Sequence, residues 1–318
     1  MASELAHVIN HRLSHSGELK PKSSGKFPRG LTFASVVIII FMLSIILGNI
    51  IWGGAGTITW DFLSSPPENG MEGGGIFPAI FGTIALVILM VIAVVPVGVF
   101  TAIYLHEYTS PTSRITKLIR QAINNLAGVP SIVFGLFGLG FFISFVGGNL
   151  DKIFYDTARP VWGQPAIIWA SLTLSLLTLP VVIISTEEAL RSIPREIKDA
   201  SLALGATKLQ TIIRVILPQA MPGILTGAIL SVSRGAGEVA PIMFTGAAYY
   251  LPYLPTKLND QFMELGYHIY VMATQSPDID KTEPILYGTV LVLLLLTFAL
   301  NFTAILIRSK MRRKRIHG

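Results

Sequence analysis

The chain has no cysteine, and charged residues make up only 13% of its 318 positions. The lack of cysteine excludes disulfide bridges, thiolate nucleophiles and cysteine-ligated metal sites. Soluble globular proteins carry about 25% charged residues, whereas 52% of this chain is hydrophobic. A chain with so much apolar mass and so few charges belongs in a lipid bilayer.

Two further signatures are missing. The first 30 residues are polar and basic and lack the apolar core that marks a signal peptide. The glycine-rich Lys-Ser/Thr loop that cradles nucleotide phosphates is also absent, since Ser24-Gly25-Lys26 lacks both the upstream glycine and the following hydroxyl residue. His7, His11 and His15 recur every four residues, but a solvated tail explains them better than a metal site. We expect no catalytic residue, no metal and no cofactor, so energy must come from elsewhere.

Six apolar runs are long enough to cross a bilayer, which takes about 20 helical residues. The runs are Leu31–Trp52, Phe77–Leu105, Asn124–Val146, Ile167–Thr186, Met221–Ala248 and Ile285–Ile307. The third contains Gly128 and Pro130 near its start, so its helix should bend there or begin just beyond. The sequence therefore predicts an all-α polytopic membrane protein. Its single six-span domain, residues 31–307, lies between basic tails at 1–30 and 308–318.

Basic residues are concentrated in the two tails and in the loops after the second and fourth spans. They are Arg12, Lys20, Lys22, Lys26 and Arg29, then Arg114, Lys117 and Arg120, then Arg191, Arg195, Lys198, Lys208 and Arg214, and finally Arg308, Lys310, Arg312, Arg313, Lys314 and Arg315. The opposite loops are mainly acidic. The positive-inside rule places both termini and the loop of residues 193–218 in the cytoplasm. In the last outer loop, residues 259–272 could form a short helix on the membrane surface.

The loop of residues 193–218 is predicted to form two short helices that meet at Gly205. Glycine permits a helix to end in a left-handed turn, and Thr207 can cap the next helix. Leu209, Ile212, Ile213 and Ile216 are spaced to share one face of that second helix. Such a shape can fit a groove on a partner, although an ordinary amphipathic loop packed on its own bundle would use the same residues.

The fifth run carries two charges, Arg234 and Glu238. Arg234 follows Pro218 by 16 residues, which is about 24 Å along a helix and places it at mid-depth. Glu238 should lie one turn further on the same face, with Gly235 and Gly237 allowing a close backbone approach. A planar guanidinium can hold an oxyanion, so we expect this pair to line a solute path. An ion pair that only neutralises both groups is the alternative.

The loop of residues 193–218 resembles the EAA loop of bacterial ABC importer permeases, written Glu-Ala-Ala-x₃-Gly-x₉-Ile-x-Leu-Pro. The matching residues are Asp199, Ala200, Ser201, Gly205, Val215, Leu217 and Pro218. Asp199 replaces the usual glutamate, so it keeps the charge but shortens the reach. The resemblance implies that this coupling loop, as we call it below, docks on a separate ATPase subunit and that the chain has the fold of type I importers.

Further stretches resemble one branch of that family, the PstA-type permeases of phosphate importers. They are residues 104–108, 125–135, 237–241 with Phe244-Thr245, and 251–256. The resemblance implies inorganic phosphate as the solute and implies several partners. These are a second homologous permease (PstC-like), a cytoplasmic ATPase dimer (PstB-like), a phosphate-binding protein (PstS-like) and membrane lipid, but no nucleic acid.

Two alternatives stay open at this point. The first is a permease for another oxyanion, such as molybdate or sulfate. The second is a stand-alone, gradient-driven transporter, which would need more ionisable residues along the spans than Arg234 and Glu238 provide.

Overall fold

The structure, a computed structural model, describes residues 26–110, 112–155 and 159–316. Most of the N-terminal basic tail, with His7, His11 and His15, lies outside the described residues. Residue contacts divide the chain into two compact units, Met1–Asn49 and Ile50–Gly318. The prediction that one domain spans residues 31–307 stays a prediction.

The first unit is represented by most of helix α2 (Lys26–Gly54). With 29 residues, α2 is about 44 Å long at 1.5 Å per residue, which exceeds the apolar thickness of a bilayer. Large apolar side chains such as Phe33, Ile39 and Phe41 are more than 60% exposed. A helix that is apolar on all sides needs lipid or other apolar helices around it.

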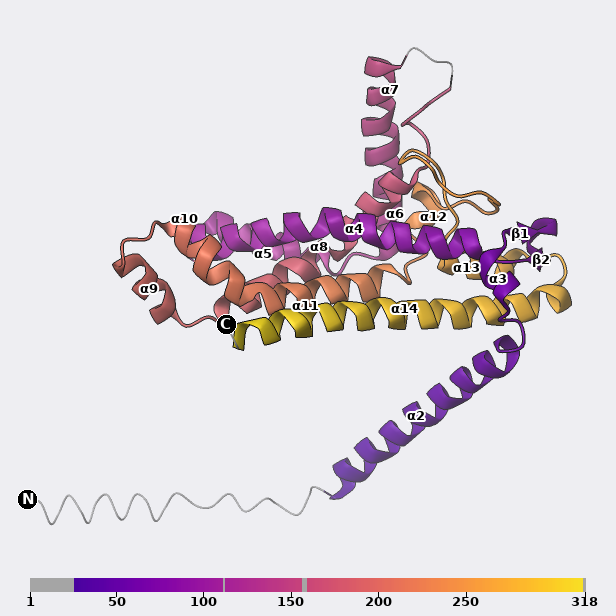
Figure 1. The fold of residues 1–318 in the computed structure, drawn as a ribbon, viewed down its shortest axis with the longest axis horizontal. Helices are drawn as coiled ribbons and strands as arrows, with labels where there is room; N and C mark the ends of the chain where they lie inside the picture. Colours follow the sequence, from indigo (N-terminus) through magenta and orange to yellow (C-terminus); the bar gives the residue numbers. More distant parts are fainter. Residues whose placement is uncertain (1–25, 111, 156–158, 317–318) are drawn as a thin grey trace, which may run out of the picture. The chain divides into compact units, whose positions relative to one another are not determined.

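The second unit contains the other five spans (Figure 1). Two short strands, β1 (Pro67–Glu68) and β2 (Gly73–Gly74), pair antiparallel around the turn η2 (Asn69–Met71). The helices are α3 (Trp60–Ser64), α4 (Phe77–Ile103), the π-helix η3 (Tyr104–Tyr108), α5 (Arg114–Leu126), α6 (Ser131–Phe137), the π-helix η4 (Gly138–Gly147), α7 (Gly148–Phe154), α8 (Ile167–Arg191), α9 (Arg195–Ala203), α10 (Lys208–Thr211), the π-helix η5 (Ile212–Ile216), α11 (Leu217–Gly235), α12 (Ile242–Thr245), α13 (Leu265–Gln275) and α14 (Ile279–Ile316).

Helix α8 forms the centre of the second unit. It packs along α4 and α11, while α14 packs on α11 and α13; Figure 1 shows α7 projecting away from this bundle. Small residues bring α11 close to α8. A Cβ atom at Gly223 would lie 2.3 Å from the Cβ of Ala189, and one at Gly227 would lie 2.9 Å from the Cβ of Ser185. Close approach through small residues is the usual way in which membrane helices gain packing energy.

The structure confirms the predicted fold class and number of spans. Six helices are long and apolar enough to cross a membrane. The third begins at Ser131, directly after Pro130. Of the two expected outcomes, the structure therefore shows a start beyond the proline and not a bend. The preceding residues form the separate helix α5, which is strongly amphipathic.

The predicted second loop helix and the start of the fifth span are one continuous helix. The chain is helical from Lys208 through η5 and α11 to Gly235, so Pro218 lies inside the helix and does not close the loop. The prediction that four apolar residues share one face is wrong, because the wider π-turn shifts the register. Ile212 and Ile216 are buried, whereas Leu209 and Ile213 are more than 50% exposed.

The short helix expected at residues 259–272 is present but is shifted toward the C-terminus, and it is partly buried in the bundle. Helix α13 (Leu265–Gln275) packs against α4 and α14 and buries Val271 and Met272. Glu264 caps it from a buried position, accepting the backbone N–H groups of Gly266 at 2.8 Å and Tyr267 at 2.7 Å. The buried cap provides an acceptor for two backbone N–H groups of the first turn, so the start of α13 can be buried.

Buried Glu264 and His268 should give the second unit a pH-dependent stability. Burial raises the pKa of Glu264 to about 7 from 4.5. Its contribution to the folding stability is therefore complete below pH 4.5 and is lost as the pH rises through 7. Burial lowers the pKa of His268 to about 4 from 6.5, so its contribution is complete above pH 6.5 and is lost toward pH 4. The two trends oppose each other between pH 4.5 and 6.5.

Replacing Glu264 should leave His268 as the main source of the pH dependence of stability. In Glu264→Gln, thermal stability in detergent should rise from pH 4.5 to 6.5 and then stay level, whereas the wild type should lose stability near pH 7. The carboxyl contribution is on the order of 3 kcal/mol at most. Unfolding temperatures measured from pH 4.5 to 8 test this, with exposed Asp280→Asn as the control. Identical pH profiles for wild type and Glu264→Gln would contradict the assignment.

Candidate functional site

The coupling loop presents the predicted docking residues on an exposed helix. None of the residues of α9 is buried; Asp199 and Ala200 are exposed, and Ser201 is half-buried. The chain then turns at Gly205, whose φ of +86° favours glycine. Leu204, beside this turn, is 90% exposed.

Glu107, at the end of the second span, fixes α9 to the bundle. Its side chain is only 2% exposed, and its Oε2 accepts a hydrogen bond from Lys198 Nζ. His106 Nδ1 lies 3.0 Å from the other carboxylate oxygen. A carboxylate buried to this degree needs such partners, so the contact holds Lys198 and the whole of α9 against η3.

The start of the next helix is held on the same segment. Lys208 Nζ donates to the backbone carbonyl of Glu107 and lies 4.4 Å from the centre of the Tyr108 ring, a cation–π contact. Thr207 and Gln210 form the capping box that begins α10, which confirms the expected cap. Both sides of the Gly205 turn are therefore attached to η3.

A second ion pair joins α5 to α8 beside the coupling loop. Arg120 Nη1 donates to Glu187 Oε2 at 2.7 Å, and its Nη2 donates to the Leu105 carbonyl at 3.0 Å. Arg191 Nη2 also lies 3.5 Å from Glu187 Oε2. Between these contacts and α9 lies a cavity of about 760 Å³, which Arg195 and Lys198 also line. The loop thus covers a basic, partly open hollow at the end of the bundle.

Arg234 and Glu238 are brought together, but not within one helix. Helix α11 ends at Gly235, and Glu238 lies in the turn before α12. Arg234 Nε donates to Glu238 Oε1 at 3.5 Å, with the side chains 37% and 20% exposed. Among the described residues, neither Nη atom of Arg234 has another hydrogen-bond partner. This weak, single contact leaves most of the guanidinium donors available to an anion.

The residue after Arg234 packs closely against α4. A Cβ atom on neighbouring Gly235 would lie 2.5 Å from the Met90 sulfur, whereas one on Gly237 would meet nothing within 4 Å. Only Gly235 therefore requires a close approach. Met90 lies about 20 Å from the Phe77 end of its span and about 27 Å from the other end. The mid-depth position expected for Arg234 in the membrane stays a prediction.

The two predicted sites lie at opposite ends of one helix. From Lys208 to Arg234 the helical chain extends about 40 Å, so the coupling loop and the Arg234–Glu238 pair are not in contact. The sequence reasoning missed the anchoring role of Glu107, Arg120 and Glu187. Acidic residues at the ends of apolar runs were the available signal, since a buried carboxylate requires a cationic or hydrogen-bonding partner.

Comparison with known proteins defines the class. Residues 94–314 match the model of the binding-protein-dependent transport system inner membrane component family. A probable ABC transporter permease, YqgI of Bacillus subtilis, is 31% identical over 89% of this chain and 94% of its own. The phosphate transport system permease PstA of Haemophilus influenzae is 30% identical over 91% and 95%. PstA 1 of Mycobacterium tuberculosis is 34% identical over 76% of this chain.

The chain belongs to the binding-protein-dependent transport system inner membrane component family. It is a multi-pass inner membrane permease of an ABC importer, which works with a separate ATPase and a binding protein and is not itself the ATPase. The fold agrees with a bacterial alginate ABC transporter crystallised with its periplasmic protein. That match has a TM-score of 0.62 at 16% identity and covers 87% of this chain and 92% of that one.

The turn at Gly205 should be sensitive to a β-branched residue. Gly205→Val forces a side chain into the left-handed region, at a cost of about 1–2 kcal/mol, although a Cβ there would meet nothing within 4 Å. We expect weaker retention of the ATPase and normal membrane insertion, measured by co-purification. Gly205→Asn is the matched control, because asparagine tolerates this conformation. Undiminished ATPase retention in Gly205→Val would remove the turn from its docking role.

The Glu107–Lys198 contact should show energetic coupling. Lys198→Gln and Glu107→Gln should each lower thermal stability in detergent, because each leaves its partner without the opposite charge. The double variant should lose less than the sum, with a coupling energy of about 1 kcal/mol. Exposed Lys117→Gln serves as the control. Strict additivity of the two single changes would show that the contact does not hold the loop.

Proposed function

We propose that this chain is the permease subunit through which a phosphate importer moves inorganic phosphate across the membrane. The observation that carries this proposal is the guanidinium of Arg234, whose Nη donors have no protein partner among the described residues, at a position that the sequence predicts to be near mid-depth. Relatives of nearly full length are named as phosphate permeases, which supports the choice of solute.

The chemistry of the solute suits this arrangement. Phosphate carries about one to two negative charges near neutral pH, and a guanidinium fork matches its oxygens. Binding must stay weak, because a path that holds its solute tightly cannot release it. Glu238 would act as a gate: it holds Arg234 in the closed state and releases it as the path opens.

The rigid helix supplies the mechanical link. A partner ATPase that moves α9 also moves Lys208, through the shared attachment to Glu107. Lys208 begins the helix that ends beside Arg234, so displacement of the loop can reach the intramembrane pair without a flexible joint. Alternating access would then follow from rigid-body motion of α11 against α8.

The proposal includes the assembly and its orientation. The permease pairs with a second homologous, PstC-like permease, two PstB-like ATPase subunits and a PstS-like phosphate-binding protein. Both termini and the coupling loop face the cytoplasm, which agrees with the basic side chains that line the hollow under α9. A reporter after Gly318 should then behave as cytoplasmic, and a tag near Asp278 should be reachable from outside.

Another oxyanion permease, for molybdate or sulfate, would use the same guanidinium, so competition between these anions in uptake decides between them. A gradient-driven transporter working alone would take up solute without a partner ATPase. Reconstitution of the co-purified complex, with phosphate uptake measured with and without ATP, separates this alternative from the proposed importer.

Substitutions of the intramembrane pair test the proposed path. Arg234→Ala should reduce ATP-driven phosphate uptake by 100-fold or more, on the scale of a lost charge-assisted contact of about 3 kcal/mol, while the complex still assembles. Arg234→Lys keeps the charge without the planar fork, so residual activity measures the charge alone. Wild-type uptake in Arg234→Ala would exclude the anion path.

Glu238→Gln distinguishes a gate from a structural ion pair. If Glu238 holds a closed state, protein abundance should stay normal and ATP hydrolysis should continue without phosphate delivery. If the pair is purely structural, Arg234→Ala and Glu238→Gln should each destabilise the protein by roughly 3–5 kcal/mol. The abundance of both variants should then fall. Abundance should then recover in the variant with both residues neutral, which would contradict the gate.

A further inference from the structure

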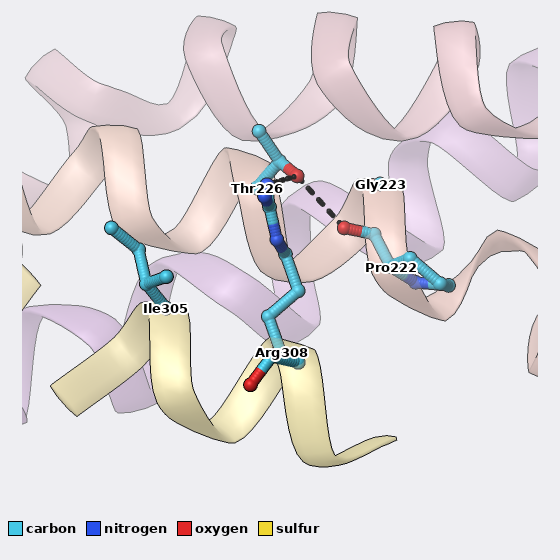
Figure 2. Close-up of a pocket in the computed structure, with 6 residues that line it drawn as sticks. Pro222, Gly223, Thr226, Ile305 and Arg308 are labelled. Carbon is cyan, nitrogen blue, oxygen red and sulfur yellow. Dashed lines mark hydrogen bonds between the residues drawn. The ribbon is translucent and has the colours of Figure 1, made fainter. Parts of the chain in front are cut away.

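A notch between α11 and α14 lies apart from both proposed functional sites. Its volume is about 350 Å³, and it is lined by Pro222, Gly223 and Thr226 of α11 and by Ile305, Arg308 and Ser309 of α14 (Figure 2). Arg308 is the first basic residue after the long apolar run of α14 (Ile279–Ile316), and Lys310 follows it by two positions. The notch is therefore at the boundary between the apolar part of the membrane and water.

The guanidinium of Arg308 is held in place at this notch. Its Nη1 donates to Thr226 Oγ1 at 2.8 Å, and that hydroxyl donates to the Pro222 carbonyl at 2.8 Å, as Figure 2 shows. The Thr226 hydroxyl thus accepts a hydrogen bond from α14 and donates one to the backbone of its own helix, α11. Among the described residues, the Arg308 side chain makes no hydrogen bond or ion pair other than the one to Thr226, so its remaining donors are available to a ligand.

The two helices that form the notch offer no negative charge to Arg308. From Pro284 to Gly318, and from Lys208 to Gly237, the sequence contains no aspartate or glutamate. Arg214 precedes Pro222 by eight positions in the same helix, and Lys310 follows Arg308 by two. A positive side chain at the end of an apolar span lowers its free energy by meeting an anion, and here that anion must come from outside this helix pair.

The surroundings favour a lipid as the source of the anion. Ile305, Leu306 and Ile307, immediately before Arg308, are 44–50% exposed and can lie along acyl chains. Basic pockets between membrane helices at the interface are suited to anionic headgroups. We propose that the notch binds the headgroup phosphate of an anionic phospholipid, with the Thr226-held guanidinium of Arg308 on the phosphate oxygens and the acyl chains along α14.

Lipid retention tests this site directly. The full chain, purified with its accompanying subunits, is placed in nanodiscs of phosphatidylglycerol and phosphatidylcholine, and retained lipid is measured by mass spectrometry after mild delipidation. The wild type should retain phosphatidylglycerol preferentially. Arg308→Gln should reduce this preference roughly tenfold or more, as expected for loss of a charged hydrogen bond. Thr226→Val should reduce it in the same direction, because Arg308 loses its support.

Lys310→Gln is the matched control, since Lys310 is exposed at the same end of α14 and does not line the notch. It should keep the wild-type preference, and millimolar inorganic phosphate should not displace the retained lipid. Equal retention of both lipids by the wild type would overturn the proposal. So would an equal loss in Lys310→Gln, which would indicate general surface attraction, or displacement by inorganic phosphate, which would indicate a soluble anion as the ligand.

Discussion

The structure depends on one buried carboxylate at the end of the second span. Glu107 receives Lys198 from α9 on its side chain and Lys208 from α10 on its carbonyl. These two contacts hold both sides of the Gly205 turn on η3, although α9 itself buries no residue. The apolar attachment of the loop lies elsewhere, at Ile212 and Ile216, which pack in one cluster with Leu190. With the two contacts to Glu107, the exposed face of α9 stays available to a partner while the opposite face is fixed.

The continuous helix from Lys208 to Gly235 is a stiff connection between the coupling loop and Arg234. Because η5 continues α10 into α11 without a break, the turn at Gly205 is the only hinge-like backbone with a positive φ among the described residues between α8 and Arg234. Gly223 and Gly227 keep this helix close to α8, so it can slide or tilt but has little room to separate. Motion that enters at the loop is therefore carried to the level of Arg234 by a stiff element, as a permease with an external ATPase requires.

Hydropathy predicted the spans because length and apolarity are local properties of the chain, and Pro130 marked the start of the third span for the same reason. The register of the coupling loop could not be predicted this way. The spacing of Leu209, Ile212, Ile213 and Ile216 assumed ordinary α-helical turns, whereas η5 is a π-helix, and its wider turns separate Ile212 and Ile216 from the other two. The burial of α13 was missed because it depends on contacts between distant parts of the sequence, such as the hydrogen bond that the Leu265 N–H donates to Thr83 Oγ1.

In the candidate site, too, local features could be predicted from the sequence and contacts between distant residues could not. Arg234 and Glu238 stood out because each is a charge within an apolar run, and the structure brings them together across the end of α11. Glu107 and Glu187 are also acids beside apolar runs, but their partners, Lys198 and Arg120, are 91 and 67 positions away. Since a buried carboxylate must be paired, the sequence implied that partners existed but not which residues they were. Arg308 is the opposite case: among the described residues, this cation is paired only with the Thr226 hydroxyl, and the proposed lipid phosphate would supply its counter-charge.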